Sequence, residues 1–223
     1  MCGRFTIAVE KDELQEYISN HYEINFLPLG FELPNFNVSP GNNVISIISD
    51  GKMYWIGLLK WGYLPPFPIK DRNGFINARA ETLFDKPSFK TAALKQRCII
   101  LADGYYEWNK DKQPMRILTD GSLFGMAGIW NTFIEEDGRK THSVAIITTT
   151  AKESISVVHN RMPVILNNDT EKIWLNPQMN IEGLKTALQP YQGEMDMYPV
   201  SNEVNYSKNN YQALIKKQSP KNA

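Results

Sequence analysis

The chain contains few of the residues that bind metals or cross-link a fold. Among its 223 residues there are two cysteines and three histidines. Cys2 and Cys98 lie far apart and form no CxxC pair, so the sequence predicts neither a disulfide framework nor a zinc site. We expect no metal and no other cofactor. A free thiol persists best in a reducing compartment, which favours a cytoplasmic location.

Long apolar runs and net charge are also missing. No stretch approaches the ~18 apolar residues of a transmembrane helix, and the first residues lack the basic and apolar regions of a signal peptide. Lysine plus arginine and aspartate plus glutamate each number 24, so the net charge is zero. This balance argues against binding of long nucleic acids by bulk charge, although a local basic cleft remains compatible with it.

Turn signals recur at spacings that suit short β-strands. Asp50-Gly51, Asp120-Gly121 and Asp137-Gly138 each separate two runs of β-formers, the strongest short-range hairpin signal. Predicted helices are short and cover residues 11–19, 80–83, 89–94, 153–158, 170–175 and 181–188. We therefore expect an α+β fold with a curved, mostly antiparallel, barrel-like β-sheet flanked by short helices.

The predicted domain organisation is simple. One domain is expected over residues 1–215, followed by a polar tail over 216–223. Cys98, in an apolar run, is expected in the core. The core or the lining of the barrel is expected to hold Trp55, Trp61 and Trp130. The surface is expected to hold His21 and His142, which have no partner motif.

The feature that most clearly indicates chemistry is the cysteine next to the start of the chain. Removal of Met1 is expected because the Cys2 side chain is small, and it leaves an α-amine and a thiol on one residue. The reference pKa of an α-amine is ~8, so part of it is neutral at neutral pH and can attack an aldehyde to form an imine. The sulfur can then close a five-membered thiazolidine ring. Retention of Met1 closes this route, because the amine is then part of a peptide bond.

Three further stretches place polar residues next to apolar ones, and each has a simpler explanation. Asn77 could cap the helix that follows it, and Arg79 could form a solvated pair with Glu81. Glu107 could be an exposed strand residue, and His159 a surface histidine. Together with a terminal thiol, these side chains supply the carboxylate, imidazole and amide that imine chemistry needs.

Eight segments of the chain resemble the SOS-response-associated peptidase family, whose members sense abasic sites in single-stranded DNA. In family order they are MCGRF at Met1, NVSPG at Asn37, WGYLPP at Trp61, INARAET at Ile76, RCIILADGYYEW at Arg97, MAGIW at Met126, HNRMPVIL at His159 and PVSNEVN at Pro199. They span residues 1–205. The family fold is a single α+β domain with a curved sheet and a groove for single-stranded DNA.

The resemblance implies a chemical role for four residues. Cys2 is the nucleophile that converts the open-chain deoxyribose aldehyde into a thiazolidine. Glu107 acts as acid and base at the α-amine and favours release of Met1. His159 is the acid that assists opening of the sugar ring and helps to reverse the link, and Asn77 positions Cys2 or the sugar.

The resemblance also implies contacts to DNA. The residues concerned are Arg4, Arg79 and Arg161 at flanking phosphates, and Pro40 and Thr148 at the pocket wall. Some relatives have more aromatic residues after the WGY motif, where this chain has Leu64-Pro65-Pro66-Phe67-Pro68. Phe67 can still stack on a base, worth ~1–3 kcal/mol. Leu101 replaces a proline that is common before the ADG motif, a change we interpret as packing.

Three functions follow from these patterns. The first is a monomeric, nucleoid-associated repair protein that forms a covalent, shielding adduct with abasic sites in single-stranded DNA. The second is a thiol peptidase that uses Cys2 and Glu107, acting at least on its own Met1. The third is a non-covalent reader of damaged DNA, for which Cys2→Ala would leave function intact and charge reversal at Arg79 and Arg161 would remove it.

Overall fold

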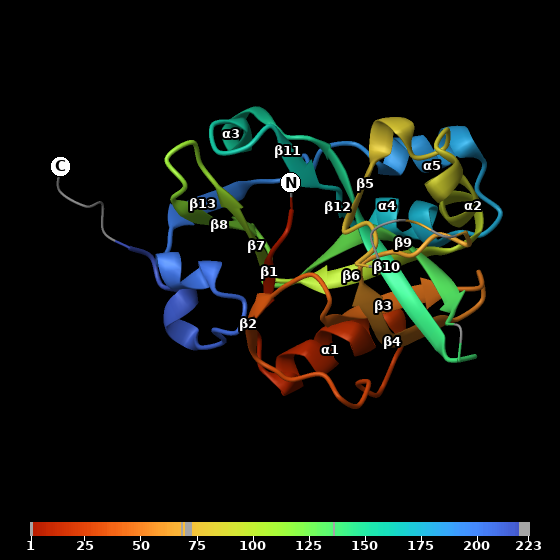
Figure 1. Ribbon diagram of the computed structural model, residues 1–223, viewed down its shortest axis with the longest axis horizontal. Helices are drawn as coiled ribbons and strands as arrows, with labels where there is room; N and C mark the ends of the chain where they lie inside the picture. Colours follow the sequence, from red (N-terminus) through yellow and green to blue (C-terminus); the bar gives the residue numbers. More distant parts are fainter. Residues whose placement is uncertain (1, 68, 70–72, 136, 219–223) are drawn as a thin grey trace.

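Two β-sheets organise the molecule, and they meet where β1 contacts β6 (Figure 1). The computed structural model describes residues 2–67, 69, 73–135 and 137–218. The smaller sheet has five strands in the order β13–β8–β7–β1–β2, all of them paired antiparallel. These are β1 (Phe5–Ile7), β2 (Asn35–Val38), β7 (Gly104–Trp108), β8 (Pro114–Thr119) and β13 (Met195–Pro199).

The larger sheet contains a closed ring of five strands in the order β3–β4–β10–β9–β6 and back to β3. These are β3 (Asn43–Ser49), β4 (Tyr54–Trp61), β6 (Arg97–Ala102), β9 (Phe124–Ile134) and β10 (Lys140–Thr150). Three short strands extend it, β5 (Asn77–Arg79) and β11 (Arg161–Pro163) on β10 and β12 (Ile165–Leu166) on β9. Only β4 and β5 pair parallel to β10 among the described strands. The predicted α+β fold with a barrel-like, mostly antiparallel sheet is confirmed.

Short helices cover the barrel. In Figure 1, α2, α4 and α5 gather on one side of it and α1 lies along β3 and β4. The helices are α1 (Lys11–Tyr22), α2 (Pro87–Lys95), α3 (Glu153–Ser156), α4 (Asn168–Leu175) and α5 (Ile181–Ala187), with 3-10 turns at Ala80–Thr82, Asn202–Asn205 and Gln212–Ile215. All six predicted helical segments are helical. Helix α4 begins at Asn168, two residues before the predicted start, because Asn167 and Thr170 form a reciprocal capping box.

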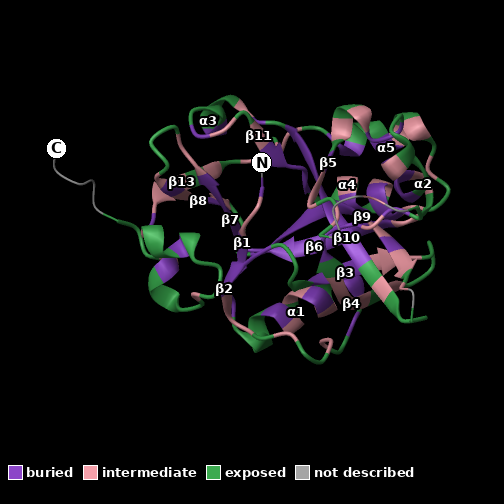
Figure 2. Cartoon of the chain, in the orientation of Figure 1, coloured by how far each residue is buried: buried purple, intermediate pink, exposed green. Residues whose placement is uncertain are grey.

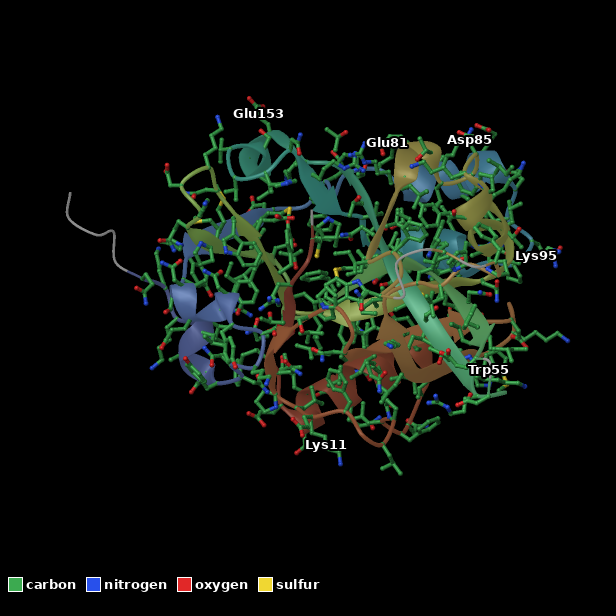
Figure 3. All side chains as sticks on the ribbon, viewed as in Figure 1. Lys11, Trp55, Glu81, Asp85, Lys95 and Glu153 are labelled. Carbon is green, nitrogen blue, oxygen red and sulfur yellow. The ribbon has the colours of Figure 1, made fainter. Side chains whose placement is uncertain are left out.

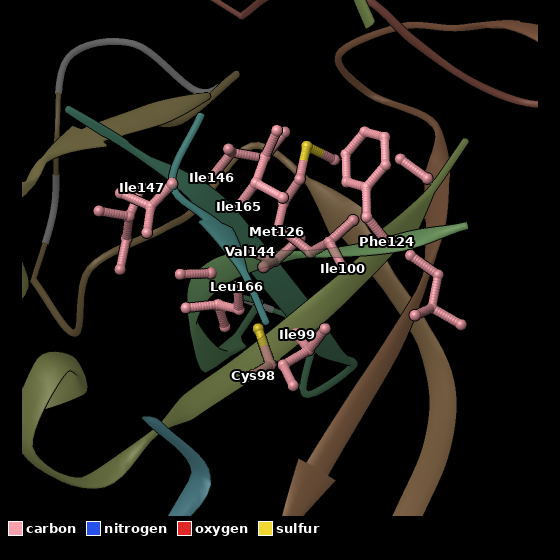
Figure 4. Packing of buried hydrophobic residues seen from close by; sticks show 14 of the residues in the cluster. Cys98, Ile99, Ile100, Phe124, Met126, Val144, Ile146, Ile147, Ile165 and Leu166 are labelled. Atoms are coloured by element: carbon pink, nitrogen blue, oxygen red, sulfur yellow. The ribbon is translucent and has the colours of Figure 1, made fainter. Parts of the chain in front are cut away.

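The barrel interior is apolar. Figure 4 shows Cys98, several isoleucines, Met126 and Phe124 in this buried cluster. Cys98 is fully buried, as predicted, and so is Trp61. Trp130 is half-buried at the edge of this core. The prediction of a core position for Trp55 was wrong: its side chain is 39% exposed, because it lies on the outer side of β4. His21 and His142 are exposed, as predicted.

Two of the three predicted hairpins are present. Strands β3 and β4 pair across Asp50-Gly51, and β9 and β10 pair across Asp137-Gly138. The third prediction was wrong, because the strands on either side of Asp120-Gly121 belong to different sheets. Strand β8 pairs with β7 and β13, whereas β9 pairs with β6, β10 and β12. An Asp-Gly pair specifies a tight change of direction, but the partner of each strand is chosen by burial.

The end of the described chain is attached to the smaller sheet. The Gln218 amide donates to the Pro199 carbonyl at 2.8 Å, so the first part of the predicted polar tail is hydrogen-bonded to the end of β13. Residues 219–223 of that tail lie outside the described residues, and so does Met1. Among the helices of the described residues, none combines the length and the apolar character needed to cross a membrane.

Candidate active site

Cys2 lies at the junction of the two sheets. The segment before β1 runs antiparallel to β7, since Phe5 pairs with Tyr105 and the Tyr106 amide donates to the Arg4 carbonyl at 2.9 Å. Figure 2 shows this segment entering the buried centre of the molecule. The Cys2 side chain is fully buried, so the surrounding side chains control its chemistry.

The Cys2 thiol stays protonated at neutral pH. Burial raises its pKa, and the negative charge of Glu107 raises the pKa further. A thiolate is the nucleophilic form of cysteine. The sulfur therefore needs a base or a hydrogen-bond donor at the moment it reacts.

Glu107 is buried in β7 beside Cys2. Only 2% of its surface is exposed, so the simpler explanation of an exposed strand residue is wrong. Burial raises the pKa of the Glu107 carboxyl, and the positive charge of His159 acts in the opposite direction. A carboxyl group whose pKa lies above its usual range can exchange protons closer to neutral pH.

The side chain of Asn77 forms a hydrogen bond with the backbone of Cys2. Its Nδ2 donates to the Cys2 carbonyl at 2.9 Å. Its Oδ1 is buried and has no hydrogen-bond partner among the described residues. Asn77 lies in β5, paired with Ile146, and Arg79 occupies the cap position of the turn that follows. The capping explanation for Asn77 is therefore wrong.

His159 reaches the site from the turn after α3. The Arg161 amide donates to its Nδ1 at 3.0 Å. In the neutral ring this leaves the proton on Nε2, the nitrogen at the far side of the ring. The His159 side chain is half-buried, and its positive charge lowers the pKa of Glu107. His159 therefore lies between the buried Glu107 carboxyl group and the solvent-exposed edge of the site.

Arg79, Thr148 and Arg161 come together on three neighbouring strands. Thr148 on β10 pairs with Arg79 on β5 on one side and Pro163 on β11 on the other. The Arg161 guanidinium forms a two-pronged ion pair with Glu81 at 2.6 and 3.0 Å and donates to the Thr148 hydroxyl at 3.3 Å. The proposed pairing of Arg79 with Glu81 is wrong in this respect, because Glu81 pairs with Arg161. Arg79 itself is exposed.

The remaining predicted DNA contacts lie apart from this edge. Arg4 donates to Asn37 Oδ1 at 2.7 Å and to the Val204 carbonyl at 2.6 Å. It therefore links the segment before β1 to strand β2 and to the 3-10 turn Asn202–Asn205. Pro40 is exposed after β2. Phe67 is 39% exposed and lines a separate cavity of about 600 Å³ with Lys60, Phe133 and Arg139.

Sequence reasoning missed one side chain of the site and one buried acid elsewhere. Tyr105 was noted only as part of an aromatic motif, although it is two residues from Glu107 on the same strand and therefore on the same face. Glu171 on α4 is 8% exposed and accepts from the Tyr22 hydroxyl at 3.0 Å. Polar and apolar residues alternate irregularly around Tyr105 and Glu171, so no sequence pattern indicated that either side chain is buried.

No group of three or more His, Cys, Asp and Glu side chains arranged to hold a metal ion occurs within the described ranges. A carboxyl group, an imidazole and an amide surround the Cys2 thiol, and removal of Met1 would add the α-amine of Cys2 to this set. This set can add an amine and a thiol to a carbonyl carbon.

Comparisons with known proteins identify the family of the chain and its shared fold. The model of the family described as SOS response associated peptidase (SRAP) matches residues 1–207. The abasic site processing protein YoqW of Bacillus subtilis is 43% identical over 96% of this chain and 99% of its own length. YedK of Escherichia coli, of the same description, is 29% identical over 96% of this chain and 99% of its own length. A crystal structure of a Bacteroides thetaiotaomicron protein superposes with a TM-score of 0.83 at 24% identity, covering 98% of this chain and all of that one, which shows the shared fold.

Proposed function

The chain belongs to the SOS response associated peptidase family, and from that premise we propose that it binds abasic sites in single-stranded DNA and joins them covalently through Cys2. The names of its relatives support the substrate class. The observation that carries the proposal is the Asn77 hydrogen bond to Cys2 beside the buried carboxyl group of Glu107. A hydrogen bond to the Cys2 carbonyl restrains the backbone of the residue that would supply both the amine and the thiol.

The first step uses the amine. Once Met1 has been removed, the sugar ring opens: protonated His159 gives a proton to the ring oxygen, the anomeric hydroxyl gives its proton to solvent water, and the C–O bond of the ring breaks to leave an aldehyde. Glu107 takes a proton from the α-ammonium, and the neutral nitrogen attacks the aldehyde carbon. A C–N bond forms and one water leaves, which gives the imine.

The second step uses the sulfur. A C–S bond forms at the imine carbon, the electron pair of the C=N bond moves to nitrogen, and the thiol proton ends on that nitrogen. This step neither gains nor loses atoms, so the adduct has the mass of protein plus DNA less one water. The five-membered ring protects the former imine from hydrolysis.

DNA is held by the edge formed by Arg79, Thr148 and Arg161. Arg79 is exposed and is the first phosphate contact in this proposal, while Arg161 is held in place by Glu81. A planar guanidinium suits two phosphate oxygens. Phe67 offers a partly exposed ring for base stacking. Arg4 supports the segment that carries Cys2 through Asn37 and Val204.

A denaturing gel tests the proposal. Trimmed protein is mixed with a single-stranded oligonucleotide that contains one abasic site. We expect a slower, denaturant-resistant band with wild type and with Cys98→Ala, which removes the core thiol, and no such band with Cys2→Ala. Retention in a native gel without a denaturant-resistant band would favour the non-covalent reader instead.

A further inference from the structure

Tyr105 carries a buried hydroxyl group that the fold leaves unused. Its side chain is fully buried, and its hydroxyl has no hydrogen-bond partner among the described residues. The neighbouring Tyr106 differs, because its hydroxyl donates to the Phe36 carbonyl at 2.9 Å. Buried polar atoms are nearly always paired, so the unpaired hydroxyl of Tyr105 requires an explanation.

The two tyrosines point to opposite faces of β7. Side chains alternate along a strand, so Tyr105 shares a face with Glu107 and Tyr106 does not. Tyr105 packs in the same buried cluster as Cys2, whereas Tyr106 packs in a second cluster with Phe36. The Tyr105 side chain therefore lies in the main core, on the face of β7 that also carries the buried Glu107.

Burial above all keeps the Tyr105 hydroxyl protonated. Burial raises the pKa of Tyr105 well above its usual value, and negative charge on Cys2 and on Glu107 raises it further. These two charges act on Tyr105 because they are close to it. The hydroxyl is thus a permanent hydrogen-bond donor at the pH values at which the thiol reacts.

We propose that Tyr105 is a positioning residue whose hydroxyl donates a hydrogen bond to the Cys2 sulfur while that sulfur carries negative charge. A neutral thiol is a weak acceptor, and a thiolate is a strong one. The donor is therefore unpaired in the resting protein and becomes paired when charge develops, as preorganised donors in reactive sites do. The part of this inference that concerns the adduct rests on the proposed function.

The hydroxyl acts between loss of the thiol proton and formation of the C–S bond. The proton that leaves sulfur is the one that finally resides on the ring nitrogen, and Tyr105 keeps its own proton throughout. The other titratable groups that act on Cys2 are Glu107 from β7, under the influence of His159, and the α-amine of trimmed Cys2 itself. Glu107→Gln therefore serves as a reference that alters charge without altering the donor.

Alkylation of Cys2 by iodoacetamide across pH tests the inference without DNA. Trimmed wild type, Tyr105→Phe and Tyr106→Phe are compared, with peptide-level mass spectrometry to separate Cys2 from the core thiol Cys98. We expect Tyr105→Phe to raise the apparent pKa of the alkylation by about one unit and to slow the reaction at neutral pH roughly tenfold, the size expected for a hydrogen bond to a charged group. Tyr106→Phe loses a satisfied hydrogen bond, so it lowers the melting temperature and leaves the pH profile unchanged.

Two results would overturn the inference. One is a folded Tyr105→Phe variant whose alkylation profile matches that of wild type. The other is an equal shift in Tyr106→Phe, which would mean a general loosening of the strand. The DNA gel separates this inference from the proposed function: wild type that forms the adduct with an unchanged Tyr105→Phe profile removes the inference alone. Wild type that forms no adduct removes the proposed function, and the alkylation profile still decides the role of Tyr105 at the thiol.

Discussion

The side-chain amide of Asn77 donates a hydrogen bond to the backbone carbonyl of Cys2 at 2.9 Å, across 75 residues of sequence. It links β5 on the barrel to the segment that leads into β1 of the smaller sheet. One side-chain hydrogen bond thus joins the residue that carries the thiol to the barrel. Because β5 pairs with β10, the position of β10 in the barrel also sets the position of Asn77 next to Cys2.

Asn77→Ala is expected to slow adduct formation about tenfold. The variant loses one buried hydrogen bond of roughly 1 kcal/mol or more, and the backbone of Cys2 is then less well oriented for the reaction. The rate is measured as band intensity over time with an abasic oligonucleotide. Asn180→Ala is the control: it removes the cap of α5, costs about 1 kcal/mol of stability and leaves the rate unchanged. Equal rates for wild type and Asn77→Ala would show that the contact is only structural.

Glu107→Gln is expected to slow adduct formation by about a hundredfold or more, the usual range for loss of a general acid or base. Burial raises the pKa of Glu107, so the wild-type rate should increase with pH at values above the usual titration range of glutamate. The Gln variant loses this part of the pH profile. Glu153→Gln on exposed α3, labelled in Figure 3, is the matched control. A pH profile shared by wild type and Glu107→Gln would remove Glu107 from the chemistry.

Arg161→Lys is expected to weaken binding of single-stranded DNA roughly tenfold, because an ammonium group cannot hold Glu81 and the Thr148 hydroxyl in one planar arrangement. Fluorescence anisotropy at two salt concentrations measures the effect. The control is Lys185→Arg, which alters an exposed lysine on α5 paired with Glu182 and should change little. The prediction fails if both variants bind alike.

Much of the fold follows from local signals, and the parts that do not are pairings between distant segments. Asp50-Gly51 and Asp137-Gly138 specify hairpins because both strands of each pair are adjacent in sequence. The ring closes through β10 and β4, which are parallel and separated along the chain by five other strands, β5 to β9, and by helix α2. No turn signal specifies such a pair. The same holds for the Asp120-Gly121 turn, whose flanking strands enter different sheets.

The candidate site shows the same division. The residue types at Cys2, Asn77, Glu107 and His159 could be identified from motifs, but their burial could not. Strand β7 is buried on both faces, so it has no alternation that would mark Glu107 as buried or Tyr105 as its neighbour. The Arg161–Glu81 pair joins residues 80 apart, which no local pattern indicates.

Glu171 should make stability depend on pH. Burial raises its pKa from about 4.5 to about 7, so the folded protein holds this proton over a range in which the unfolded chain has lost it. The stabilisation is complete below pH ~4.5 and is lost as pH rises through ~7. We expect Glu171→Gln to gain roughly 2–3 kcal/mol relative to wild type between pH 5 and pH 8, measured by urea unfolding. Exposed Glu182→Gln on α5 should show no such trend, and a flat difference for Glu171→Gln would contradict the account.

Intact mass spectrometry before and after incubation with an abasic oligonucleotide tests the central claim most directly. The account predicts a starting mass without Met1 and a gain equal to the oligonucleotide mass less one water, absent in Cys2→Ala. Correctly trimmed wild-type protein that shows no gain would contradict covalent capture through Cys2.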